Sequence, residues 1–397
     1  MSLSDPRASR TFCSQAWNHQ FVGPGGRTKP CCRFRWPEVP EKNHLDRYDR
    51  LEDLFNDAFM NDLREKMSRG EELPGCQRCY DEEKAGKRLS LRQYYNQERH
   101  INEELDTSQP RISYLELSFD NTCNIRCRMC EPLYSTNWQK DWKALTGKEP
   151  LGRLKLDPEK LRSVVPHLRH IKFTGGEPFL IRDYERLLDF AVETGAAKNI
   201  YLNYSTNLTV PVSDRLLKLW EHFKYVELAV SLDGVGPVIE YVRHPTRWQQ
   251  VEKVTEQLLS LSKFMDVRCG VRSTMMIYNI LNLPKIERWW KEQVDTWSNA
   301  TYGEESWFNP AHLAFPDDLS LRVLPEKDKE MVKRALWDQG LTRKSRKSMN
   351  HLCNYMLQED HSQLLPRFRE RTMKLDKLRG EDFRNLVPEL AHLLSLS

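Results

Sequence analysis

The middle of the chain alternates short apolar runs with longer segments whose apolar residues recur every three or four positions. Apolar runs typical of buried strands cover residues 112–119, 170–174, 199–205, 226–232 and 267–275, with a weaker one at 306–309. Helical spacing is found in residues 157–165, 182–194, 212–223, 248–264 and 283–297. This alternation indicates a parallel sheet built from βα units, with functional loops at the carboxyl ends of its strands.

The two ends of the chain have different patterns. Residues 1–105 are rich in loops, and only 51–67 and the charged stretch 84–99 have helical spacing. After residue 311, helical spacing returns in the charged segments 326–337, 348–358 and 364–378. We therefore predict an α/β protein with three parts: a loop-rich N-terminal region (1–105), a core (106–310) and a helical C-terminal extension (311–397).

The composition excludes several classes of protein. Hydrophobic residues make up 39% of the 397 residues, which is enough for a core and unlike a disordered chain. The net charge is only +4, so charge neither indicates nor excludes a nucleic-acid partner. No run approaches the ~18 apolar residues of a membrane span, and the first ten residues do not resemble a secretory signal. We expect a cytoplasmic protein with no membrane partner.

Ten cysteines are too few for a disulfide scaffold, but eight of them lie close together in three places. These places hold Cys13, Cys31 and Cys32; Cys76 and Cys79; and Cys123, Cys127 and Cys130. In a cytosolic chain, closely spaced cysteines are more typical of metal ligands or catalytic groups than of disulfides.

The last three cysteines follow a predicted strand in the pattern Cys-x3-Cys-x2-Cys. Iron–sulfur clusters normally take four thiolates, so three would leave one iron open for a substrate or cofactor. Structural zinc takes four ligands, and no fourth cysteine or histidine lies close in the sequence.

Further short motifs follow the next predicted strands in order: Phe173-Thr174-Gly175-Gly176-Glu177-Pro178, Tyr204-Ser205-Thr206-Asn207, Ser231-Leu232-Asp233-Gly234 and Tyr241-Val242-Arg243-His244-Pro245. Together with the cysteine triplet, they resemble the radical S-adenosylmethionine (radical SAM) superfamily over about residues 111–309. The resemblance implies a partial (β/α)6 TIM-like barrel and a [4Fe–4S] cluster on Cys123, Cys127 and Cys130.

The resemblance also implies the contacts to S-adenosylmethionine (SAM). The turn of Gly175, Gly176, Glu177 and Pro178 corresponds to the site of the methionine amino group, and Arg243 to the partner of its carboxylate. Met129 stands where the family often has an aromatic residue, and a methionine can also cover an adenine face. The remaining predicted contacts lie at strand ends: Ser205 and Asn207 at the ribose, and Ser231 and Asp233.

In such a family, reductive cleavage of SAM gives a 5′-deoxyadenosyl radical, which removes hydrogen from a substrate. This chemistry needs an electron donor such as flavodoxin or ferredoxin. No side chain stands out in the sequence as a general acid or base.

The N-terminal cysteines have the spacing Cys-x12-Gly-x4-Cys, followed by Cys76-x2-Cys79. This resembles the auxiliary-cluster segments called SPASM and twitch domains, although these usually follow the barrel. The resemblance implies a second, auxiliary [4Fe–4S] cluster and leaves Cys32, Cys269 and Cys353 as ordinary thiols; its ligands would be Cys13, Cys31, Cys76 and Cys79. Four thiolates are also a full set for zinc, so a structural zinc knuckle is the alternative.

Three functions follow. The first is a radical SAM enzyme that modifies a peptide or protein, by analogy with proteins that carry auxiliary clusters. The second is a radical SAM enzyme acting on a small molecule or nucleotide, whose phosphates a basic cluster at 343–347 would hold. The third is a non-enzymatic iron–sulfur or zinc protein, which predicts no cleavage of SAM.

Overall fold

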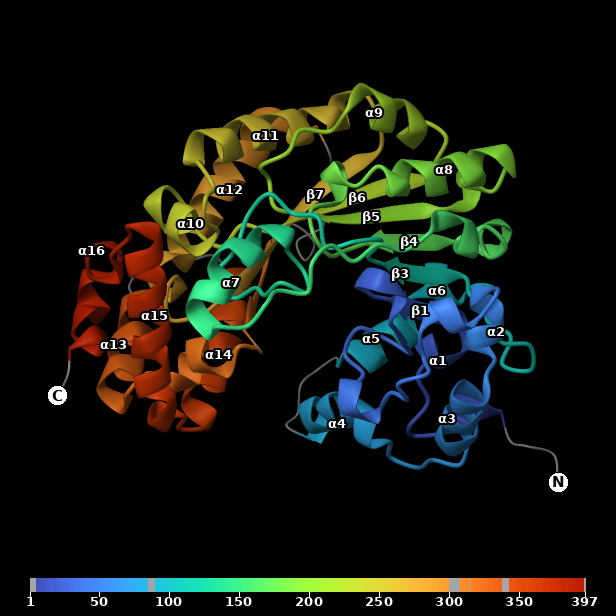
Figure 1. The fold of residues 1–397 in the computed structure, drawn as a ribbon, viewed down its shortest axis with the longest axis horizontal. Coiled ribbons are helices and arrows are strands. Elements are labelled where there is room, and N and C mark those ends of the chain that lie inside the picture. The colour runs from blue at the N-terminus through green and yellow to red at the C-terminus, as the bar shows by residue number, and fades with distance from the viewer. Residues whose placement is uncertain (1–4, 85–89, 300–307, 314, 338–342, 396–397) are drawn as a thin grey trace. The chain divides into compact units, whose positions relative to one another are not determined.

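The computed structural model describes residues 5–84, 90–299, 308–313, 315–337 and 343–395. Its strands are β1 (His19–Val22), β2 (Thr28–Lys29), β3 (Tyr114–Leu117), β4 (His170–Phe173), β5 (Tyr201–Thr206), β6 (Tyr225–Val230), β7 (Val267–Met275) and β8 (Phe308–His312). They form one sheet in the order β2-β1-β3-β4-β5-β6-β7-β8 (Figure 1). β1 and β2 are antiparallel, whereas the pairs β1–β3, β3–β4, β4–β5 and β7–β8 are parallel. This mostly parallel, unclosed sheet confirms the predicted α/β fold of the partial-barrel type.

Helices separate successive strands of the central region, as the spacing predicts. They are α8 (Asp183–Glu193), α9 (Asp214–Trp220), α10 (Pro237–Val242), α11 (Trp248–Ser260) and α12 (Leu283–Trp297). The N-terminal part contains α1 (Gln15–Asn18), α2 (Leu51–Phe55), α3 (Ala58–Ser68), α4 (Gln77–Lys84), α5 (Leu91–Gln97) and α6 (Arg99–Asn102), and α7 (Gln139–Thr146) follows β3. The C-terminal part contains α13 (Glu326–Trp337), α14 (Arg343–Gln358), α15 (Leu365–Arg379) and α16 (Phe383–Leu386).

The chain divides into two compact units, each built from several segments. Unit 1 comprises residues 1–121, 153–204 and 213–226, and unit 2 comprises residues 122–152, 205–212 and 227–397. The three-part division expected from the sequence stays a prediction.

An aromatic cluster forms the core of unit 1 beneath β4 and β5. Phe173 lies 4.5 Å from Tyr184 and 4.6 Å from Tyr204, measured between ring centroids. Trp220 of α9 packs on Tyr204 at 5.3 Å, and its indole N–H donates to the Tyr204 hydroxyl at 3.2 Å. All four rings are buried, so α8 and α9 cover this face of the sheet through apolar contacts.

The N-terminal part differs from its prediction, because β1 and β2 add two strands to the edge of the sheet. Their residues include His19, Gln20 and Lys29, which give no apolar alternation for sequence analysis to detect. These polar side chains are nevertheless buried, since Gln20 donates to the carbonyls of Phe21 and Lys29 and His19 bonds the carbonyl of Pro30.

Two predicted helices also differ. Residues 157–165 form only short 3-10 turns, at Pro158–Leu161 and Val165–His167, and Pro166 lacks the N–H group that would continue an α-helix through the second turn. The predicted helix over 51–67 is interrupted at Asp57, whose carboxylate accepts the N–H of Met60 and so starts α3.

In unit 2, the predicted C-terminal helices are present, and their aromatic residues pack on one another. Tyr278 lies 5.6 Å from Phe368 of α15 and 5.7 Å from Phe383 of α16. Trp290 of α12 is fully buried, so it is part of the core. Of the strand predicted at 306–309, residues 306 and 307 lie outside the described residues. Among the described helices, none has the length and apolar character required to cross a lipid bilayer.

The Tyr204–Trp220 hydrogen bond gives a testable prediction about unit 1. Replacing Tyr204 with Phe keeps the ring packing but leaves the buried Trp220 N–H without its acceptor, which costs about 1–3 kcal/mol of unfolding free energy. Urea unfolding followed by tryptophan fluorescence measures the loss. Tyr201→Phe, on the same strand at a half-buried position, is the control and should change stability by less than about 0.5 kcal/mol. Equal effects of both substitutions would contradict the assignment.

Candidate functional site

In unit 2 the loop after β3 brings Cys123, Cys127 and Cys130 together. Cys127 is buried and the other two are half-buried. Burial, followed by the nearby Cys127 and Cys123, raises the pKa of Cys130. The loop turns back on itself, because the Cys130 N–H donates to the Cys127 carbonyl at 2.9 Å. Three thiols thus share one small region, as the spacing predicts.

Backbone hydrogen bonds fix the shape of this loop. The indole N–H of the buried Trp138 donates to the Cys127 carbonyl at 2.8 Å, and the Ser135 hydroxyl donates to the Ile125 carbonyl at 2.6 Å. The N–H of Arg128 donates to the carbonyl of Val242, at the end of α10, at 2.8 Å. The cysteine positions are therefore set by a bonded frame rather than by a free loop.

Arg243 and Asp233 form a buried pair beside these thiols. Two guanidinium nitrogens of Arg243 lie 2.8 and 2.7 Å from the same carboxylate oxygen of Asp233, and a third lies 3.7 Å from the Cys127 sulfur. The other oxygen of Asp233 accepts the N–H of Thr274 at 2.7 Å. Burial lowers the pKa of Arg243, but Asp233 and then Cys127 outweigh burial and hold it above its usual value. Asp233 therefore orients Arg243 toward the cysteine loop.

Of the other predicted site residues in unit 2, some lie near the three thiols and others do not. Asn207 lies with its amide nitrogen 3.8 Å from the Cys123 sulfur and donates to the side chain of Asn124 at 3.0 Å. The N–H of Ser231 donates to the Thr206 carbonyl, which places the ends of two strands side by side. Ser205 and Met129 are half-buried. The structure thus brings Asn207 and Arg243 to the thiols, whereas among the described residues no hydrogen bond joins the side chain of Ser205, Ser231 or Met129 to them.

The Gly-Gly-Glu-Pro turn lies in unit 1. Gly175 has φ of +72°, and a Cβ atom there would lie 1.9 Å from the Ser118 hydroxyl oxygen, so only glycine fits. Glu177 is fully buried, and its carboxylate accepts the N–H of Phe179 within the turn. Pro178 follows as the first residue of a 3-10 turn. The conformation of the turn thus depends on Gly175 and Glu177.

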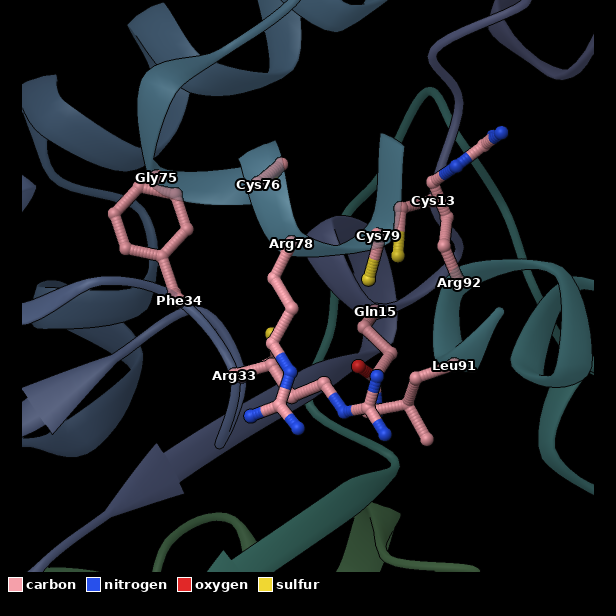
Figure 2. A pocket seen from close by; sticks show the side chains of 11 residues that line it. Cys13, Gln15, Arg33, Phe34, Gly75, Cys76, Arg78, Cys79, Leu91 and Arg92 are labelled. Atoms are coloured by element: carbon pink, nitrogen blue, oxygen red, sulfur yellow. The ribbon is translucent and has the colours of Figure 1, made fainter. Parts of the chain in front are cut away.

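Unit 1 also holds a cavity of about 20 Å³ that is lined by all four predicted N-terminal ligands, Cys13, Cys31, Cys76 and Cys79. Gln15, Arg33, Arg78 and Arg92 line the same cavity. Figure 2 shows the sulfurs of Cys13 and Cys79 close together. Burial raises the pKa of Cys13 and of Cys31 to about 12, and the neighbouring thiols contribute. Cys13 and Cys79, which are 66 positions apart in the sequence, therefore line the same site.

Cys32 has different surroundings from Cys31. Burial and then Glu116 raise the pKa of Cys32, and Lys172 and Lys29 act in the opposite direction. Cys32 does not line the cavity of the four cysteines. This geometry agrees with the assignment of Cys31 to the set and of Cys32 as the spare.

Gly75 allows the two chain segments that line this cavity to pack closely against each other. A Cβ atom at Gly75 would lie 2.1 Å from the ring of Phe34, and the Gly75 carbonyl accepts the N–H of Arg35 at 3.1 Å. Phe34 belongs to the apolar cluster that also includes Cys13. The segment Leu73-Pro74-Gly75-Cys76 is thus packed directly against the segment that carries Cys31.

Both cysteine sets fit iron–sulfur clusters in the number and type of their donors: three thiols for a cluster with one open iron, and four for a fully ligated one. Among the described residues, no group of three or more His, Cys, Asp or Glu side chains is arranged to hold a single metal ion. The ligands of one zinc ion must all meet at one point, whereas the ligands of a cubic iron–sulfur cluster bind separate irons.

Sequence analysis did not identify two residues near these sites. The side chain of Arg128, within the cysteine loop, is buried, and no pattern in the sequence distinguishes it from a surface arginine. Gln15 is 2% exposed and lines the N-terminal cavity, and its amide nitrogen has no hydrogen-bond partner among the described residues. By contrast, Cys269 contacts the Leu258 carbonyl in the core and Cys353 is buried on α14, as ordinary thiols would be.

Comparison with known proteins links this geometry to a family. Residues 117–287 match the family model of the Radical SAM superfamily. A GTP 3′,8-cyclase of Vibrio cholerae is 26% identical over 195 residues, which are 47% of this chain and 53% of that protein. Molybdenum cofactor biosynthesis protein 1 of Dictyostelium discoideum is 24% identical, over 54% of this chain and 32% of that protein. The chain thus spans about half the length of the first of these curated relatives and about a third of the second.

Solved structures are also similar to the chain. AnSMEcpe with bound AdoMet has a TM-score of 0.39 and 19% identity, over 58% of this chain and 60% of that one. Streptococcus suis SuiB bound to precursor peptide SuiA has a TM-score of 0.37 and 14% identity, over 66% and 58%. The family match contains the cysteine triplet and the motifs that follow it, so residues 117–287 of this chain are similar to the radical SAM superfamily of enzymes.

Proposed function

We propose that the chain cleaves SAM reductively at a [4Fe–4S] cluster held by Cys123, Cys127 and Cys130, and that it oxidises a peptide or protein substrate with the help of a second cluster. The observation that carries the proposal is the pair of cysteine sets, one of three thiols and one of four, each gathered by the fold.

When bound at the three thiols, a reduced cluster supplies the electron that splits SAM into methionine and a 5′-deoxyadenosyl radical, which takes a hydrogen atom from the substrate. Arg243 supports this chemistry as a cation fixed beside Cys127, where a carboxylate of the cofactor is expected. Asp233 holds that guanidinium in one orientation, and Asn207 presents an amide N–H on the Cys123 side.

The four-thiol site has a different task. Four cysteines would ligate all four irons of a [4Fe–4S] cluster, so no iron would be left open for a substrate. The site is therefore suited to accept the electron that a substrate radical gives up, while a proton goes to solvent. Arg33, Arg78 and Arg92 line the same cavity and stabilise added negative charge there.

A nucleotide is the second candidate substrate, because the GTP 3′,8-cyclases among the curated relatives carry a nucleotide in their name. In the basic cluster at 343–347 that would hold its phosphates, the side chains of residues 343–345 and 347 lie outside the described part of the chain, and Arg346 is exposed. Electron donors such as flavodoxin or ferredoxin and a cytoplasmic location belong to this proposal.

The first prediction concerns SAM cleavage. Anaerobically reconstituted protein, reduced with dithionite, should release 5′-deoxyadenosine from SAM, and changing Cys123, Cys127 and Cys130 to Ala should abolish the release because the cluster loses its ligands. Chromatography of the nucleoside measures the result. Cys269→Ala, which removes a core thiol, is the control and should retain cleavage. Cleavage by the triple variant would overturn the proposal.

The second prediction separates the two adjacent cysteines. The reconstituted chain should hold about eight irons, from two cubes of four. Cys31→Ala should lower the content to about four and keep basal SAM cleavage, whereas Cys32→Ala should keep about eight. Mass spectrometry measures the iron and zinc content of both variants. Zinc in the N-terminal site would favour a structural zinc knuckle. Loss of iron in Cys32→Ala but not in Cys31→Ala would make Cys32 the ligand and Cys31 the ordinary thiol.

The third prediction concerns substrate class. Extract from cells grown in deuterated medium is separated into a peptide and protein fraction and a nucleotide fraction, and each is incubated with enzyme and SAM. Deuterium should enter 5′-deoxyadenosine from the peptide and protein fraction, because the radical takes its hydrogen from the substrate. Mass spectrometry of the product detects it. Transfer from the nucleotide fraction alone would establish the second candidate instead.

A further inference from the structure

Arg128 lies inside the cysteine loop, between Cys127 and Met129, and its side chain is fully buried in unit 2. Its guanidinium forms ion pairs with Asp376 of α15 and with Glu381, which follows that helix; the distance to Glu381 is 2.6 Å. A buried cation is stable only when it is paired and hydrogen-bonded. The loop and the C-terminal extension are thus joined through one desolvated charge.

The surroundings of Arg128 allow little freedom to this pair. The guanidinium lies 3.5 Å from the centre of the Tyr241 ring and 5.3 Å from that of Tyr278. The Tyr241 hydroxyl donates to Asp376 at 2.8 Å, and the N–H of Phe383 donates to the other oxygen of Asp376 at 2.9 Å. Both partners of the ion pair are therefore held by further bonds.

A second attachment joins the extension to the same loop. Arg379, the last residue of α15, donates to the Arg126 carbonyl at 2.9 Å and pairs with Asp141 of α7 at 2.9 Å. Its guanidinium lies 5.3 Å from the centre of the Trp138 ring, the same indole that donates to the Cys127 carbonyl. The extension thus contacts the loop on both sides of Cys127.

Glu381 links this network to the residues after Arg243. The Nδ1 of His244 lies 2.6 Å from Glu381, and the Nε2 of His244 accepts from Arg126 at 3.0 Å. One carboxylate therefore contacts Arg128 of the cysteine loop and the neighbour of the arginine expected at the cofactor carboxylate. Outer contacts of this kind orient metal ligands, and their loss typically weakens a metal site.

We propose that the C-terminal extension clamps the cysteine loop, and that Arg128 is a positioning residue which, with Asp376 and Glu381, orients Cys127 and Cys130 so that SAM can bind at the open iron. Buried ion pairs contribute little net stability, whereas they hold groups in one arrangement, and this arrangement is their role here. The inference rests on the proposed function, since it concerns the cluster that the proposed function places on the loop.

The test compares two buried carboxylates of the C-terminal extension that each pair with an arginine. Asp376→Asn breaks the pair with Arg128, and Asp318→Asn breaks the pair with Arg371, whose nitrogen lies 2.5 Å from Asp318. Within the described part of the chain, no hydrogen bond or ion pair joins Arg371 to residues 123–130. Both aspartates are at least nine-tenths buried, so the two variants are matched in burial and charge.

The full-length reconstituted variants are titrated with SAM, and the electron paramagnetic resonance signal of the reduced cluster is recorded. Asp376→Asn should bind SAM about 10- to 100-fold more weakly than wild type, as for lost outer contacts of metal ligands. Amide hydrogen exchange across residues 123–130 should become about 10- to 100-fold faster, because a charged hydrogen bond that restrains the loop is gone. Asp318→Asn should match wild type in both measurements, even if its melting temperature falls as much as that of Asp376→Asn.

SAM affinity and exchange within twofold of wild type in Asp376→Asn would overturn the clamp, as would equal losses in Asp318→Asn. Should Asp376→Asn not fold, Arg128→Lys carries the test, since it keeps the charge but cannot reach both carboxylates with a planar fork. Its SAM affinity should fall within the same range, and an unchanged affinity would overturn the inference. Wild-type protein whose signal does not respond to SAM would contradict the proposed function instead.

Discussion

A buried arginine requires compensating charge, and this requirement organises unit 2. Arg128 cannot be left unpaired away from water, so the chain supplies Asp376 and Glu381 from a segment almost 250 residues later. Those carboxylates are held in turn by Tyr241, His244 and a backbone N–H. The loop that carries three cysteines is thereby attached to helices that a description of the barrel alone would omit.

Burial imposes a similar requirement on the cysteines. Desolvation raises the pKa of Cys13, Cys31 and Cys127, so none of them favours the thiolate form by itself. Metal ligation requires the thiolate, so iron bound as the proposed function expects would have to supply the positive charge that stabilises it. At Cys127, Arg243 contributes a fixed cation as well. Burial thus explains the raised pKa of these thiols, as it does for Cys269 in the core.

The family match covers the catalytic region and leaves both ends of the chain outside. Residues 117–287 contain the cysteine triplet, but not the four N-terminal cysteines, and not Asp376 or Glu381. The proposed auxiliary cluster and the proposed clamp therefore lie in the parts of this chain that the family match does not describe. These two regions are where this chain departs from what the family model covers.

The sequence by itself determined the strand–helix alternation, the cysteine triplet and the order of the motifs at strand ends, because periodicity and spacing are local properties. It did not reveal β1, whose buried residues are polar, or the short turns at Pro158 and Pro166. The spacing already favoured Cys31 over Cys32 through the family resemblance, and the tertiary structure added that Cys31 lines the N-terminal cavity and Cys32 does not. It also decided that Arg128 is buried, because the carboxylates that neutralise it come from the other end of the chain, and a contact over that distance leaves no periodic trace in the sequence.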